Sequence, residues 1–440
     1  MKKTAVGVIV LLILFLFCGC DALTSNTEEL LRPPELTGEF KPINEALKSS
    51  VKGDITLKYP STGEYRSSVV LRDTDGDGVK EAFVFYGTSE KEQTSMNISL
   101  IRQVGGKWRV IDSQTITGSG VDKIDFCDMD GDGKEEILVG WEIYASSEKQ
   151  LAVYSLTDKS LVQRMLEQYT TFTCCDLDEN SEQEVLLQYL DVTASKNTAS
   201  LIRLDVNGIL KIGSCVMDGN VKAVKEPQLS VLSNGRPAIY FDEIKGIGAV
   251  TEVLFYMKGE LVNPLLDSEA RENKLTLRDS AIMSEDINND GIIEIPAASS
   301  IANADISGSE KIFYTDWCAY NGETLTKMKV SIVNTVDGYR LDIPEKWVNN
   351  IAVFKDNDSK LRIIYEYDSI SGEIGERLLT VKKVSPSDYK NSKGINKKTA
   401  IKLFENSSAV YIAFIPDGYS GKLAINESEL KEMFVLMQFE

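Results

Sequence analysis

Asp73-Thr-Asp75-Gly-Asp77-Gly78-Val-Lys-Glu81 is an acidic segment that runs directly into the apolar stretch Ala82-Phe-Val-Phe-Tyr86. Carboxylates stand at positions 1, 3 and 5, glycine stands at position 6, and a glutamate closes the segment at position 9. Glycine allows a sharp backbone bend, and a stretch rich in valine and aromatic residues is typical of a strand. The segment therefore predicts an acidic loop between two strands.

This pattern recurs three times, at residues 128–136, 176–184 and 286–294, and each copy again runs into an apolar stretch. The opening aspartates stand at 73, 128, 176 and 286, so neighbouring copies are 55, 48 and 110 residues apart. Because the last spacing is twice the first, a copy is missing near residue 231. There, residues 228–241 keep two apolar runs around an Asn234-Gly235 turn but have no acidic residue.

Each copy is followed by a second strand–turn–strand pattern, which indicates five repeats of about four short antiparallel strands. The turns of these patterns lie at Gly105-Gly106, Asp158, Asn207-Gly208, Gly259 and Asn321-Gly322. Repeats of this length, none of which can bury both faces alone, are typical of propeller blades. We predict a mainly β chain with a β-propeller of five four-stranded blades, with six as the alternative.

The acidic segments have the chemistry of a hard-cation site. Alternate side chains of a tight loop turn inward, and ligand sets made only of oxygen favour Ca²⁺ over zinc or copper. An EF-hand would need a glutamate at position 12, where this chain has Val84, Val139, Leu187 and Ala297. The segments are therefore predicted to be hairpin loops. The alternative is that they are ordinary solvated turns, since Asp and Gly are common turn formers.

The four segments resemble the FG-GAP/VCBS repeats of integrin-like β-propellers over roughly residues 65 to 330. The resemblance implies structural Ca²⁺ at up to four sites. The third segment departs from the pattern because Ser181 stands where glycine is expected. The implied ligands are Asp73, Asp75, Asp77 and Glu81; Asp128, Asp130, Asp132 and Glu136; Asp176, Asp178, Asn180 and Glu184; and Asp286, Asn288, Asp290 and Glu294.

The N-terminal residues resemble a bacterial lipoprotein signal. Two lysines precede an apolar run from Ala5 to Phe17, and Gly19-Cys20 follows. The resemblance implies removal of residues 1–19, lipidation of Cys20 and a membrane-anchored, extracytoplasmic location. Phe17 departs from the family pattern, which usually has leucine there. A retained spanning helix is the alternative, although the run is shorter than the roughly 17 residues that such a helix needs.

The rest of the chain divides by pattern. Residues 20–45 are predicted to be a tether, and residues 46–335 the propeller. The acidic signature stops near residue 336, and four strand-like runs followed by a charged, helix-compatible end predict a small α+β domain over residues 336–440.

Composition limits the classes of function. The net charge of −19 argues against binding to nucleic acid. The chain contains no histidine, which excludes Ser-His-Asp and Cys-His catalysis and histidine-ligated metals. The cysteines form no CxxC pair, so a zinc site is not expected. We expect a non-catalytic binding or adhesion module for a protein or glycan. The alternatives are an assembly component of an envelope complex and a propeller lyase or hydrolase.

Overall fold

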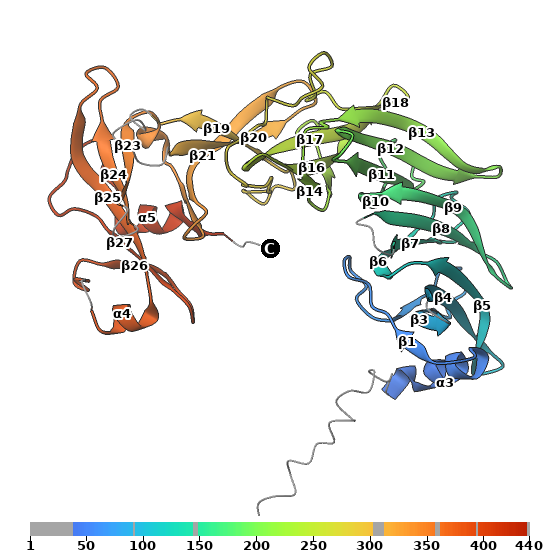
Figure 1. Ribbon diagram of the computed structural model, residues 1–440. Helices are drawn as coiled ribbons and strands as arrows, with labels where there is room; N and C mark the ends of the chain where they lie inside the picture. The colour runs from blue at the N-terminus through green and yellow to red at the C-terminus, as the bar shows by residue number, and fades with distance from the viewer. Residues whose placement is uncertain are drawn as a thin grey trace, which may run out of the picture. The chain divides into compact units, whose positions relative to one another are not determined.

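The computed structural model describes residues 38–90, 93–143, 148–301, 312–356, 361–392 and 395–437. Within these ranges the chain forms six antiparallel sheets and a few short helices (Figure 1). It divides into two compact units, Met1–Phe126 with Gly133–Glu167, and Cys127–Asp132 with Gln168–Glu440. The mainly β class is confirmed. Cys20 and the predicted signal segment lie outside the described residues.

The first sheet belongs to the first unit and contains a meander of four strands in chain order. An additional strand, β1, pairs with β3 beside β2. A second meander of four strands follows along the chain. The strands are β1 (Ile55–Leu57), β2 (Val69–Arg72), β3 (Glu81–Glu90), β4 (Gln93–Val104) and β5 (Lys107–Thr117), then β6 (Gly120–Cys127), β7 (Glu136–Glu142), β8 (Lys149–Leu156) and β9 (Leu161–Tyr169).

A helix packs on the first sheet where the sequence predicted the end of a tether. The 3-10 turn η1 (Gly38–Phe40) leads into α3 (Lys41–Ser50). Ile43 and Leu47 are one turn apart and are buried in one cluster with residues of β2 and β3. Residues 41–45 therefore do not belong to a tether. The apolar spacing of four residues and Pro42 in the first turn both favour this helix.

The second unit continues the meander through three more sheets. The predicted turns at Asn207-Gly208, Gly259 and Asn321-Gly322 each join two neighbouring strands. The strands are β10 (Thr171–Cys175), β11 (Glu184–Asp191), β12 (Lys196–Asp205) and β13 (Gly208–Met217); β14 (Ala223–Val224), β15 (Gln228–Val231), β16 (Pro237–Lys245), β17 (Gly248–Met257) and β18 (Glu260–Val262); and β19 (Ile295–Ser300), β20 (Phe313–Tyr320), β21 (Leu325–Asn334) and β22 (Tyr339–Asp342).

The C-terminal residues form a sixth sheet whose strands lie in the order β23-β24-β25-β27-β26. The elements are η2 (Glu345–Trp347), β23 (Ile351–Asp356), β24 (Leu361–Tyr367), β25 (Ile374–Val384), α4 (Pro386–Lys390), β26 (Ile401–Glu405), β27 (Val410–Phe414), α5 (Glu427–Met433) and β28 (Phe434–Leu436).

This sheet and the fifth sheet share a single hydrophobic core, in which Ile332 and Tyr339 lie with Ile364 and Leu379. The last strand, β28, returns to pair with β22. Since β22 itself pairs with β21 across a turn at Gly338, the fifth sheet extends past the residue-336 boundary that the sequence suggested. In the described ranges no helix is both long and apolar enough to cross a membrane.

Candidate metal sites in the acidic hairpin loops

The first three acidic segments form the loops that join the first and second strands of a meander, between β2 and β3, β6 and β7, and β10 and β11. The fourth precedes β19, and its first strand is reduced to one bridge between Glu285 and Glu294. The glutamate at position 9 begins or directly precedes the second strand and is buried in every copy. Its exposed fraction is 3% for Glu81, 4% for Glu136, and 0% for Glu184 and Glu294.

The four loops share one backbone conformation. Positions 4 and 6 both have positive φ, in the left-handed region that favours glycine. The first two loops have glycine at both positions, whereas the third has Glu179 (φ 60°) and Ser181 (φ 72°) and the fourth has Asn289 (φ 61°) and Gly291 (φ 86°). Ser181 therefore does not abolish the loop. It adopts the glycine conformation at a cost of about 1 kcal/mol.

Two hydrogen bonds recur and fix the acidic side chains. The amide of position 6 donates to the aspartate at position 1, over 3.0 Å in the first loop, 3.1 Å in the third and 2.9 Å in the fourth. The amide of position 2 donates to Oε2 of the glutamate, over 3.0, 2.9 and 3.0 Å in the same loops. One glutamate oxygen is therefore anchored by the backbone, and Oε1 is left to face the loop.

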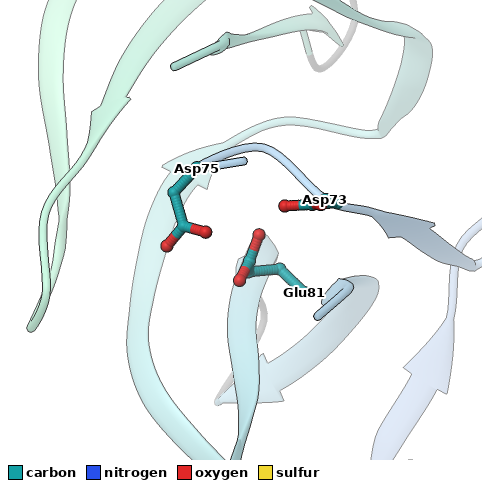
Figure 2. A group of neighbouring side chains, drawn as sticks. All are labelled: Asp73, Asp75 and Glu81. Atoms are coloured by element: carbon teal, nitrogen blue, oxygen red, sulfur yellow. The ribbon is translucent and has the colours of Figure 1, made fainter. Parts of the chain in front are cut away.

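In the first and third loops the carboxylates at positions 1, 3 and 9 converge. Figure 2 shows Asp73, Asp75 and Glu81 turned toward one another. Their ligand oxygens lie within 4.8 Å of each other, as do those of Asp176, Asp178 and Glu184. Three negative charges this close repel one another unless a cation lies among them. The second loop lies where the chain passes from one unit to the other: Asp128, Asp130 and Asp132 belong to one unit and Glu136 to the other.

The predicted ligands at position 5 close the turn. Asp77 and Asn180 accept hydrogen bonds from the amides two residues later, over 2.7 and 2.6 Å, and Nδ2 of Asn180 also donates to Oδ2 of Asp178 over 3.1 Å. Asp77 is not part of the three-carboxylate group of the first loop. Alternation of acids along the loop does not by itself distinguish an inward-facing carboxylate from one that caps its own loop.

The fourth loop also differs from the prediction. In the described residues, Asp286, Asp290 and Glu294 do not come together as a three-carboxylate group. Asn288 stands at position 3, and its amide nitrogen donates to Oε1 of Glu294 over 3.2 Å and to Asp290 over 3.0 Å. This amide partly satisfies the acids of the loop without an ion.

The first loop contains a cation of its own. Arg102, on β4, places Nη2 2.5 Å from Oδ2 of Asp75 and Nε 3.4 Å from Oε1 of Glu81. The arginine side chain is 18% exposed. Burial raises the pKa of Glu81, and the hydrogen bonds from Thr74 and the charge of Arg102 oppose that shift. The guanidinium therefore contacts two of the three carboxylates and offsets one of their three negative charges.

The third loop has no equivalent contact from β12. Arg203 lies 3.9 Å from Glu182 instead. Glu184 is fully buried and its Oε1 has no hydrogen-bond donor, and Oδ1 of Asp176 is likewise buried without one. Burial, followed by the charges of Asp178 and Asp176, raises the pKa of Glu184 to about 8. Oxygen atoms of this kind, gathered around one point, fit a hard divalent ion such as Ca²⁺.

A second group of buried acids lies in the fourth sheet and was missed by the sequence analysis. Glu243 on β16 and Glu252 on β17 are both fully buried. Asn197 donates to Glu243 and Asn263 donates to Glu252, each over 2.7 Å. Asp218, beside the pair, is bonded by Lys245 over 2.7 Å.

Burial, and then the mutual repulsion between the two carboxyls, raises the pKa of Glu243 well above its ordinary value. Burial also raises the pKa of Glu252. The two glutamates lie diagonally opposite each other, because Glu243 pairs with Val250 and Phe241 pairs with Glu252. Only the strand register, which the sequence did not provide, reveals this contact.

The comparisons with known proteins assign neither a family nor a function. No family model matches the chain, and no curated protein matches it. Among solved structures, a Bacillus licheniformis rhamnogalacturonan lyase is 11% identical with a TM-score of 0.30, covering 81% of this chain and 90% of that one. A Pseudomonas aeruginosa periplasmic gluconolactonase is 12% identical with a TM-score of 0.27, covering 72% and 86%. The Dos1 propeller is 10% identical with a TM-score of 0.28, covering 84% of each chain. Similarity this low carries no assignment to the chain.

Proposed function

We propose that this chain is a calcium-binding β-propeller protein of five blades that acts as a non-catalytic binding or adhesion module for a protein or glycan. In this proposal Cys20 carries a lipid that holds the module at the extracytoplasmic face of a membrane. The observation that carries the calcium assignment is the fully buried Glu184, whose Oε1 lies beside Asp176 and Asp178 without a hydrogen-bond donor.

The physical argument concerns the cost of burying charge. A buried carboxylate without a partner is strongly destabilising, and a protein compensates for it with a cation, a donor or a proton. The third loop has three carboxylates together, and its backbone fixes only one oxygen of Glu184. Ca²⁺ accepts irregular shells of six to eight oxygens, so water can complete the shell around three carboxylates. The ion would then tie the loop to the start of β11.

A binding role is favoured over a catalytic one because the clustered acids can each be given a structural role. The acids of the loops lie at strand connections and suit structural ions. The other buried pair, Glu243 and Glu252, is fully buried, and in the described residues neither side chain is exposed to a substrate. An assembly role in an envelope complex is the second candidate, and a propeller lyase or hydrolase is the third.

The calcium assignment is tested by thermal unfolding of the full chain in EDTA and in about 1 mM Ca²⁺. For a dissociation constant of about 10⁻⁴ M, one occupied site adds about 1.4 kcal/mol, which corresponds to a rise of a few degrees. The Asp178→Asn and Glu184→Gln variants are expected to lose most of that rise.

Glu179→Gln is the matched control, because it removes one exposed charge from the same loop without touching the carboxylate group. It should retain the full response to calcium. If calcium shifts none of the four proteins, the loops are ordinary acidic turns and the calcium part of the proposal is wrong. The anchor is tested separately: Cys20→Ser is expected to release the chain from the membrane fraction of its host.

A further inference from the structure

The residue opposite the closing glutamate differs from sheet to sheet. The strand register shows which residue lies opposite the closing glutamate. The residue after each glutamate pairs with a residue of the next strand in the repeat, and the position that follows this partner faces the glutamate. The pairs are Ala82 with Ile101, Ile137 with Tyr154, Val185 with Ile202 and Ile295 with Cys318. That next residue is Arg102 in the first sheet, Ser155 in the second, Arg203 in the third and Ala319 in the fifth. The first and third loops thus each have an arginine at this position, but only Arg102 contacts carboxylates of the converging group.

Arg102 lies where a bound ion would place its charge. Its guanidinium contacts Asp75 and Glu81, which are two of the three carboxylates drawn in Figure 2. The contact is well shielded from water, because the exposed fractions of the three side chains are 18%, 20% and 3%. An ion entering this loop must therefore displace a guanidinium that is already paired with the oxygens it needs.

Arg203, at the equivalent position, does not compete in this way. It lies 3.9 Å from Glu182, at position 7, and the two side chains are 34% and 47% exposed. A pair at that distance and exposure contributes little. The carboxylates of Asp176, Asp178 and Glu184 are left without a guanidinium among them.

We propose that Arg102 is a built-in counter-ion that competes with the divalent cation for Asp75 and Glu81, so the first loop binds calcium weakly and the third binds it tightly. This inference rests on the proposed calcium function and ranks the calcium affinities of the first and third loops. A unit charge within about 4–6 Å changes the proton affinity of a carboxyl by about 1–3 pH units. Removing Arg102 should therefore strengthen calcium binding at the first loop by about tenfold or more.

The test is calorimetric titration of the full chain with CaCl₂. Arg102→Gln is expected to strengthen one site by about tenfold or more, and adding Asp75→Asn to that variant should remove the gain. Arg102→Lys keeps the positive charge and should remain close to the parent chain. Arg109→Gln is the control, because Arg109 is exposed and pairs with Arg102 across β4 and β5, whereas the described ion pairs of Asp75 and Glu81 are made by Arg102.

The possible failures are distinct. If the parent chain binds calcium, Glu184→Gln removes that binding, and Arg102→Gln leaves the isotherm unchanged, the role of Arg102 is wrong while the calcium function stands. An equal gain in calcium affinity in Arg109→Gln would also overturn the role of Arg102, because the effect would then be one of net charge. If none of the proteins, including the parent chain, binds calcium, the proposed function fails and this inference fails with it.

Discussion

The first and third acidic loops have the same backbone and the same three carboxylates, yet they balance their charge differently. In the first loop, Arg102 contacts Asp75 and Glu81. In the third, Arg203 is directed at Glu182, and Oε1 of the buried Glu184 has no donor. The loop signature alone does not reveal this difference. The side chain on the neighbouring strand determines whether an arginine lies among the carboxylates.

The fourth sheet buries two acids without an acidic loop. Glu243 and Glu252 belong to no acidic hairpin loop, and burial raises the pKa of both carboxyls, which favours their protonated forms. The Arg102 guanidinium, the proposed metal ion of the third loop and a raised carboxyl pKa would each lower the cost of burying negative charge. The free energy of unfolding in EDTA, measured for the parent chain and its variants, distinguishes the three.

The largest expected effect is the pH dependence that Glu243 produces. Its folded pKa lies above its unfolded pKa, so the folded state holds a proton that the unfolded state releases. Stability is then fully present below about pH 4.5 and falls as pH rises toward the folded pKa, by about 1.4 kcal/mol per pH unit for one proton. Glu243→Gln mimics the protonated form and should remove the one-proton slope that begins above about pH 4.5. An unchanged slope would rule out the retained proton.

The next largest effect is the difference in stability between variants of the closing glutamates Glu184 and Glu81. Because the pKa of Glu184 is raised to about 8, keeping this carboxyl buried at pH 7 without metal costs free energy. Glu184→Gln should raise stability in EDTA by about 2 kcal/mol at pH 7. Glu81→Gln should give a smaller gain, because Arg102 already lies against that carboxylate. Equal gains in urea unfolding would contradict the contrast between the loops.

The two arginines are predicted to differ in the same assay. Arg102→Gln removes a shielded partner of Asp75 and Glu81 and should lower stability in EDTA by about 1.5 kcal/mol. Arg203→Gln removes a longer, exposed pair and should change stability by less than about 0.5 kcal/mol. A similar loss in both variants would mean that the arginines are structural in a way unrelated to the acids.

The smallest effect concerns the backbone at position 6. Ser181→Gly relieves a left-handed φ of 72° and should stabilise the chain by about 1 kcal/mol. Gly78→Ser, at φ 85° in the first loop, should destabilise it by a similar amount. If Ser181→Gly is destabilising instead, the serine side chain has a role in the third loop that its hydrogen bonds do not reveal.

The hairpins were predictable from sequence because turn residues and apolar runs locate them directly. Gly105-Gly106 lies between β4 and β5, and Asn207-Gly208 lies at the turn from β12 to β13, as the local chemistry requires. The helix α3 was missed because its apolar pair, Ile43 and Leu47, lies in a short segment that follows a polar stretch. The pairing of β28 with β22 joins residues about a hundred positions apart, which no local pattern encodes.

The candidate sites were predictable only in part. Positions 1, 3 and 9 follow from the spacing of acids, and the structure brings them together in the first and third loops. The sequence called the third loop into question, because Ser181 replaces glycine. In the structure this loop has a buried glutamate, Glu184, whose Oε1 has no hydrogen-bond donor. The partners that distinguish the loops, above all Arg102, come from another strand. Both Arg102 and Arg203 follow Leu-Ile in the sequence, so only the register and side-chain contacts separate them.

The most direct test of the account is equilibrium dialysis of the full chain against calcium at about 10⁻⁴ M, the affinity typical of extracellular modules. The parent chain, Glu184→Gln and Glu81→Gln would be compared by the amount of ion bound per chain. The account predicts that the parent chain binds calcium, that Glu184→Gln loses a bound ion, and that Glu81→Gln loses little at this concentration. A chain that binds no calcium, or that loses its ion through Glu81 and not through Glu184, would contradict it.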